Sequence, residues 1–130
     1  MRAVHPIAVA GAVVAALIHL WFFAMESLWF MRPSVWRRFG IASEADAGLV
    51  RSWAFNQGFY NLFLAVAVAA GLALVATGQP EAGRAIVLSA CASMMAAGVV
   101  LFLHNPKFLR AAALQVVPAL VAVVGIIVLR

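Results

Sequence analysis

The sequence has 130 residues, of which 67% are hydrophobic and only 10% are charged, with a mean hydropathy of +1.08. A soluble domain is about half apolar and a quarter charged, so this composition excludes an ordinary soluble domain and indicates an integral membrane protein. The net charge of +5 does not indicate nucleic-acid binding, because no basic run alternates with exposed aromatic residues. The single cysteine, Cys91, excludes an intramolecular disulfide, and its small neighbours predict a packing role.

The first apolar segment, residues 6–30, exceeds the roughly 20 residues that span a bilayer core. Its length and the lack of a small-x-small cleavage pattern argue against a signal peptide. His19 and Glu26 interrupt it seven positions apart, so they share one helix face. Small residues that allow close helix approach continue this face: Ala8, Ala12 and Ala15.

Residues 32–40 form a basic connector in which Trp36 and Phe39 stand beside arginines. Aromatic residues next to basic ones are typical of a segment at the level of the lipid headgroups. Ser43 is followed by acidic residues, which predicts that it is the N-cap of a second helix over residues 44–76.

The second segment carries four polar side chains where the surroundings are otherwise expected to be hydrocarbon. On a helix they fall within one face about 140° wide, and they are Asn56, Gln57, Tyr60 and Asn61. Polar side chains inside a membrane are costly and usually face protein or trapped water. We therefore expect another part of the chain to meet this face.

Two further apolar segments, residues 84–103 and 108–129, follow turns at residues 77–83 and 104–107. The third segment has small residues at four-residue spacing, which predict a packing seam: Ser89, Ser93 and Ala97. The pattern as a whole predicts an all-α fold, in which residues 1–130 form a single four-helix transmembrane bundle.

The distribution of basic residues predicts the orientation of this bundle. With four alternating spans, both termini lie on one side of the membrane together with the turn at 77–83. That side has three basic residues: Arg2, Arg84 and Arg130. The other side has six: Arg32, Arg37, Arg38, Arg51, Lys107 and Arg110. Because basic residues are retained in the cytoplasm, we expect both termini to lie outside.

A helix rises about 1.5 Å per residue, so the distance of each polar residue from the end of its segment gives its expected depth. By this measure, the polar side chains of separate segments lie at similar depth, in the half of the bilayer nearer the cytoplasm. The other half is mainly Ala, Val, Leu, Ile and Gly. We expect the polar groups to line a pocket open to the cytoplasm, where they would bind a ligand. These candidate residues are His19, Glu26, Asn56, Gln57, Tyr60, Asn61 and Gln115.

The ten residues from Asn56 to Ala65, NQGFYNLFLA, resemble the most recognisable motif of a bacterial membrane family known as domain of unknown function thirteen-oh-four. Met25-Glu26, after His19 and several aromatic residues, is similar to the first helix of that family. The run Gln115–Leu120 is similar to the pattern of its last helix.

Two positions depart from the family pattern. Ile18 stands where a glutamate is expected, and Val116 stands where a glycine is usual. The missing glutamate removes any role that needs a Glu-His pair at that position. The resemblance implies a small multi-pass protein of the bacterial inner membrane, with no established activity.

Three functions agree with the candidate residues. The first is binding or transport of a small, partly apolar ligand, coupled to proton exchange through Glu26. The second is a membrane-embedded enzyme of isomerase or epoxide-opening type, with His19 and Glu26 as acid and base and Tyr60 as a donor. In the third, the polar side chains only hold the helices together by hydrogen bonds.

No cofactor and no metal site is predicted. A metal or haem held through His19 is a minority alternative, in which His104 and one carboxylate would be further ligands if the helices of the two histidines are adjacent. The expected partners are the lipid bilayer and a small lipophilic or amphiphilic ligand. A homodimer is also compatible with four short helices around an open pocket.

Overall fold

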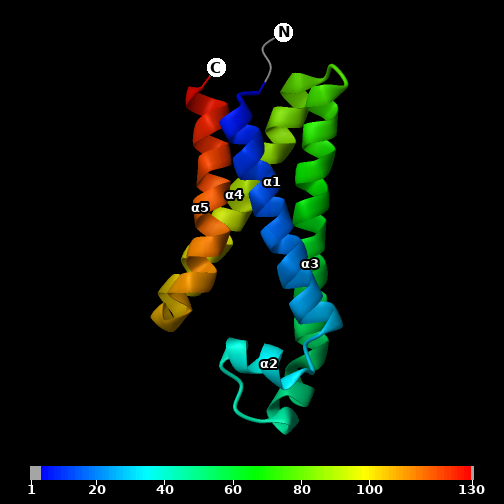
Figure 1. Cartoon of the computed structure of the whole chain (residues 1–130), viewed down its shortest axis with the longest axis vertical. Coiled ribbons are helices and arrows are strands. Elements are labelled where there is room, and N and C mark those ends of the chain that lie inside the picture. The colour runs from blue at the N-terminus through cyan, green and yellow to red at the C-terminus, as the bar shows by residue number, and fades with distance from the viewer. Residues whose placement is uncertain (1–3, 130) are drawn as a thin grey trace. The chain divides into compact units, whose positions relative to one another are not determined.

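The computed structural model describes residues 4–129, which are mostly helical and include no strand. Four long helices are present, and they are α1 (Pro6–Phe23), α3 (Glu44–Ala76), α4 (Pro80–His104) and α5 (Leu109–Val128), shown in Figure 1. Each is part of a segment that is long and apolar enough to cross a membrane. The prediction of an all-α chain with four membrane-length helices is therefore confirmed. Arg2 and Arg130, used in the charge count, lie outside the described residues.

The helix boundaries follow the sequence signals with two differences. α3 begins where the cap predicts, since the backbone N–H of Asp46 donates to the Ser43 hydroxyl at 3.1 Å. α4 begins at Pro80 rather than near residue 84, because proline suits the first helical turn. Gly78, with φ of 89°, makes the turn just before it.

The end of the first segment also differs from the expected continuous α-helix to residue 30. α1 ends at Phe23 and continues as a π-helical turn over Ala24–Leu28. The connector after it contains a short helix, α2 (Pro33–Trp36), and a 3-10 turn over Arg37–Phe39.

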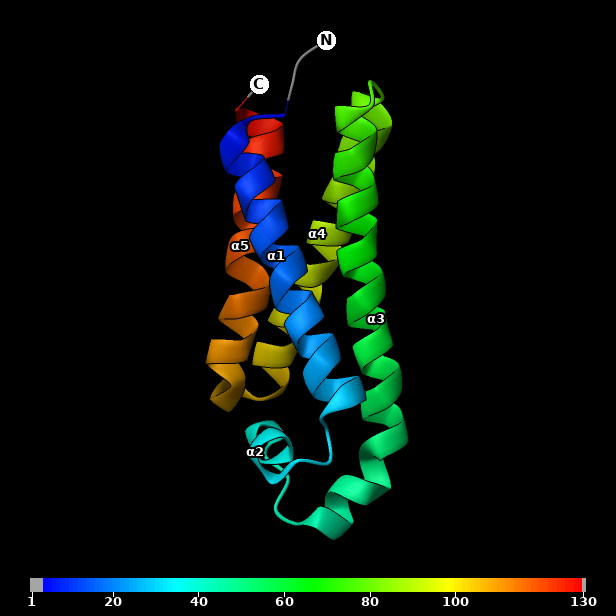
Figure 2. The ribbon, with the colours of Figure 1, turned by 45° about the vertical axis from the view of Figure 1, so that its right-hand side comes forward.

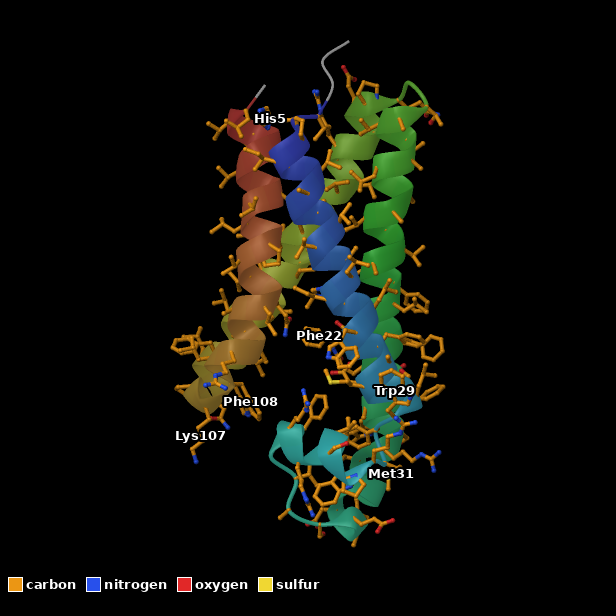
Figure 3. The ribbon with its side chains drawn as sticks, viewed as in Figure 1. His5, Phe22, Trp29, Met31, Lys107 and Phe108 are labelled. Carbon is orange, nitrogen blue, oxygen red and sulfur yellow. The ribbon has the colours of Figure 1, made fainter. Side chains whose placement is uncertain are left out.

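The chain divides into two compact units. The bundle unit contains the chain up to Ile18 and from Leu64 onward, and the connector unit is His19–Phe63. In the bundle unit, α4 and α5 run side by side in both views (Figures 1 and 2). Figure 3 shows His5 at one end of this unit and Lys107 with Phe108 at the other.

Small residues bring the helices of the bundle unit close together. A Cβ on Gly125 of α5 would lie 2.7 Å from the Ala8 Cβ of α1, and one on Gly71 of α3 would lie 2.7 Å from Val87 Cγ2 of α4. The buried core has the following members: Ala12, Ala15, Val68, Val87, Ala90, Cys91, Met94, Ala119 and Ala122. The packing roles predicted for Cys91 and for the alanines of the first segment are confirmed.

The seam predicted on the third segment is wrong. Ser89, Ser93 and Ala97 are exposed, and the Ser93 hydroxyl donates to the Ser89 carbonyl of its own helix at 2.9 Å. The buried face of α4 is instead offset by one position and mixes small residues with larger ones: Gly83, Val87, Ala90, Cys91, Met94 and Gly98. Spacing alone could not separate these two neighbouring faces of small residues.

The connector unit has its own apolar cluster. Phe30, Trp36 and Ala47 are buried together, and Phe39 and Ile41 are among the residues packed against them. Trp36 is only 5% exposed, so it belongs to this cluster and is not an exposed anchor. Within the described residues, its indole N–H is buried without a hydrogen-bond acceptor.

Candidate functional site

The π-helical turn packs directly on α3. The backbone N–H of Trp29 donates to the Ala24 carbonyl at 2.9 Å, five residues back. The Ser27 hydroxyl donates to the Phe55 carbonyl of α3 at 2.8 Å. Gly58 allows this approach, because a Cβ there would overlap the Ser27 hydroxyl. A π-helical turn is rare and is frequently found at functional sites, so this is the part of the connector unit to search for a site.

Glu26 lies inside the π-helical turn and contacts α3. The amide Nδ2 of Asn61 donates to Glu26 Oε2 at 2.7 Å. Asn61 is only 7% exposed, so its amide is fixed by its surroundings. This bond uses one carboxylate oxygen, and a carboxylate can accept several hydrogen bonds. Glu26 can therefore accept from a further donor while Asn61 holds it in place.

A cavity of about 320 Å³ adjoins this carboxylate. Its polar side chains are Glu26 and Gln57. The remaining lining is apolar or aromatic: Phe30, Phe39, Ile41, Val50, Trp53 and Ala54. All eight residues belong to the connector unit. The arrangement combines one acidic group with aromatic walls, as small-molecule sites with a few fixed polar groups do.

The four polar residues of α3 do not share one environment. Asn61 is buried and Gln57 lines the cavity, whereas Asn56 and Tyr60 are exposed and absent from its lining. The buried side of this part of α3 includes Ala47 and Asn61, and at about 100° per residue Asn56 points roughly 180° away from Ala47. The polar face is thus rotated away from the packed face, and only its edge meets the π-helical turn.

His19 lies deep in the protein, with an exposed fraction of 1%. Its ring meets the Phe22 ring edge to face, with the centroids 5.7 Å apart. It does not line the cavity that Glu26 lines. Of the three residues suggested for catalysis, only Glu26 adjoins this cavity, since Tyr60 is 59% exposed and also absent from the lining.

Gln115 belongs to the bundle unit. Its residue is half-buried, and its Cβ lies 3.1 Å from the position of a Cβ on Gly98 of α4. This contact places the base of the Gln115 side chain against α4. A role for Gln115 beside Glu26 stays a prediction.

The minority metal hypothesis needs three ligands in one place. Within residues 4–129, no group of three His, Cys, Asp or Glu side chains is placed to hold a metal ion. His104 is the last residue of α4. The next residue, Asn105, begins a turn in which its side-chain oxygen accepts from the backbone N–H of Lys107 at 3.1 Å.

Sequence reasoning missed two residues that shape the site. In the sequence, Ser27 has no feature that distinguishes it from an ordinary helix residue, and Gly58 is one residue of the NQGFYNLFLA motif. The available signal was a glycine in the middle of an apolar helix, which often marks a close approach of another backbone. The π-helical turn itself has no sequence signature at this position.

Comparisons with known proteins identify a family of unknown function. A family model described as "protein of unknown function (DUF1304)" matches residues 13–127. No curated protein and no solved structure matches the chain. The match includes the whole connector unit with the π-helical turn, Glu26 and the polar stretch of α3.

Proposed function

The chain belongs to the DUF1304 family, whose function is unknown, and we propose from its own site that it is a multi-pass membrane protein that binds a small, partly apolar ligand. The ligand site is the cavity beside Glu26. The observation that carries this proposal is the position of the Glu26 carboxylate, which is held by Asn61 on one oxygen and adjoins an aromatic-lined cavity.

The chemistry of the lining favours a ligand with a positively charged or hydrogen-bond-donating group. Glu26 supplies a carboxyl group that is negatively charged when ionised, and Gln57 supplies a neutral amide. Phe30, Phe39 and Trp53 supply aromatic rings, whose faces attract cations. No basic residue is among the described residues that line the cavity. An organic amine with an apolar body therefore fits best.

The membrane boundary supports an interfacial position for this site. α3 has 33 residues and is therefore about 50 Å long, whereas the hydrocarbon core is about 30 Å thick. The polar beginning of α3 must therefore extend outside the core. The apolar end of α3 at Ala76 lies about 20 residues beyond Gln57, and about 20 residues span the hydrocarbon core. Gln57 therefore lies near the boundary between the hydrocarbon core and the headgroups. The ligand would enter from the headgroup level.

The orientation is part of the same proposal. The basic residues of the connector unit favour placing it on the cytoplasmic side of the bacterial inner membrane, with both termini outside. Proton-coupled transport of the ligand would require Glu26 to exchange a proton, and this is an extension of the binding function. The single acidic group at the cavity makes Glu26 the residue through which that coupling would act.

A second candidate function is favoured by one observation. The hydrogen bond from Asn61 to Glu26 joins α3 to the π-helical turn, which is what polar side chains do when they only hold helices together. In that case Glu26 has no ligand. The enzyme alternative is less well supported, because neither His19 nor Tyr60 lines the cavity.

Replacement of Glu26 separates these functions. Benzyltrimethylammonium combines one positive charge with one aromatic ring and serves as a probe, and its uncharged carbon isostere serves as the comparison. Glu26→Gln keeps an oxygen that accepts from Asn61 but removes the charge. We therefore expect this variant to bind the cationic probe at least about tenfold more weakly than wild type. Calorimetry in detergent measures the affinity. Glu44→Gln removes an exposed carboxylate at the start of α3 and is the matched control. Equal binding by wild type and Glu26→Gln would favour the packing function.

A further inference from the structure

We infer that a second cavity of the connector unit binds a phosphate group, carried by an anionic phospholipid or free in solution. This cavity has a volume of about 170 Å³. Its polar lining consists of Arg32, Ser34 and Arg38, and two tryptophans, Trp21 and Trp29, form much of the remainder. It shares no lining residue with the cavity beside Glu26, so the inference does not depend on the proposed function.

Two guanidinium groups line this cavity without being neutralised by their contacts. The Arg32 guanidinium carbon lies 5.2 Å from the centroid of the Trp29 ring. The Nε of Arg38 donates to the Ser34 carbonyl at 3.3 Å. Neither partner carries a negative charge, and no acidic side chain is among the described residues that line the cavity.

The contacts of the two arginines also fix their positions. Stacking on Trp29 holds the Arg32 side chain, and the bond to Ser34 uses only one of the five N–H donors of Arg38. The remaining donors and the Ser34 hydroxyl are available to phosphate oxygens. A planar guanidinium fits phosphate geometry through paired hydrogen bonds.

The surroundings of the cavity favour the phosphate of a lipid over a soluble anion. The membrane-length segment ends at Leu28; Trp29 is the next residue, and Arg32 lies three residues after Trp29. The rings of Trp21 and Trp29 meet edge to face, with centroids 5.6 Å apart, and Trp21 is 49% exposed. Tryptophan and arginine together at the end of a span are typical of the headgroup level. Met25 and Val35 add apolar lining that an acyl chain can contact.

Lipid binding by charge-matched variants tests the inference. The probe is phosphatidylglycerol, titrated into the full-length protein in detergent and counted as bound lipid by native mass spectrometry. The double variant Arg32→Gln/Arg38→Gln should bind it at least about tenfold more weakly. Arg37→Gln/Arg51→Gln removes the same charge from the same unit at positions outside the cavity, and it should bind like wild type.

Inorganic phosphate identifies the source of the phosphate group. If phosphate at millimolar concentration displaces phosphatidylglycerol from wild type, the site takes the free anion as well. If it does not, the acyl chains contribute and the occupant is the lipid. Equal weakening in the two double variants would show that only net charge matters and would overturn the inference, as would unchanged binding in both. Thermal unfolding of each variant establishes that it is folded.

Discussion

The hydroxyl of Ser27 lies in the space that a Cβ on Gly58 would occupy. The two residues are on separate helical segments, and their contact lets the Ser27 hydroxyl reach the Phe55 carbonyl at 2.8 Å. The same approach brings the Glu26 Cβ within 3.1 Å of a Cβ on Gly58. The glycine therefore sets the distance between α3 and the π-helical turn, and with it the position of the acidic group at the cavity.

Gly58→Ala should destabilise the protein by about 1–3 kcal/mol, because the added methyl group overlaps Ser27 and overpacking of a tight contact costs about this much. Gly48→Ala is the matched control on the same helix, since a Cβ there meets nothing within 4 Å. Alanine favours a helix by about 0.5–1 kcal/mol over glycine, so this variant should be neutral or slightly more stable. Thermal unfolding in detergent measures both. If Gly58→Ala proved as stable as Gly48→Ala, the contact would not be tight.

Asn61→Leu should weaken the connector unit and the binding of the cationic probe together. The change removes the 2.7 Å hydrogen bond to Glu26, which contributes about 0.6–2 kcal/mol if it is typical of interhelical bonds in membranes. Asn56→Leu changes an exposed residue one turn away and should alter the free energy of unfolding by less than about 0.5 kcal/mol. Urea-dependent unfolding and calorimetry on the two variants test the difference. Equal losses would show that the bond to Glu26 has no special role.

Gly98 and Val116 should be energetically coupled. A Cβ on Gly98 would lie 2.6 Å from Val116 Cγ2, so Gly98→Ala should cost about 1–3 kcal/mol by overpacking. Val116→Ala removes the methyl group that the new Cβ would meet. The double variant should therefore be more stable than the sum of the single changes predicts, by at least about 0.5 kcal/mol. Additive losses would mean that the carbonyl of Ala112, 3.0 Å from the same Cβ position, dominates.

Cysteine labelling tests the orientation of the chain. Ala42 and Gln79 are exposed residues at the connections before α3 and before α4. The native Cys91 is buried and should not react. A membrane-impermeant maleimide should label Gln79→Cys in intact cells and Ala42→Cys only after lysis. The opposite pattern would place the basic connector outside the cell.

The sequence predicted most of the fold because hydrophobic length and caps act locally. Ser43 starts its helix through a contact within one turn, so this signal can be read from neighbouring residues. The start of α4 at Pro80 was predicted four residues too late, because Pro80 also fits the turn that precedes the helix. The packing of the π-helical turn on α3 could not be predicted, because it joins Ser27 to Phe55 and to a glycine, which lie far along the chain. The exposed position of Ser89 was missed for a related reason, since two faces of α4 have similar small residues.

The site was only partly predictable. Glu26 stood out as a carboxylate in an apolar segment, and its partner Asn61 lay within the polar stretch. Which polar residues of α3 face Glu26 depends on the rotation of the helix, and a face about 140° wide does not determine that rotation. Phe39 lines the cavity because of how the connector folds, and helix periodicity in the sequence does not predict the fold of a connector.

The most direct test of the ligand site compares two neighbouring positions of α3. Both residues are exposed, but Gln57 lines the cavity beside Glu26 and Asn56 does not. Alkylation of Gln57→Cys by a soluble maleimide should slow several-fold when benzyltrimethylammonium is present, and alkylation of Asn56→Cys should not change. Protection of both cysteines to the same extent, or of neither, would contradict a ligand bound against Glu26.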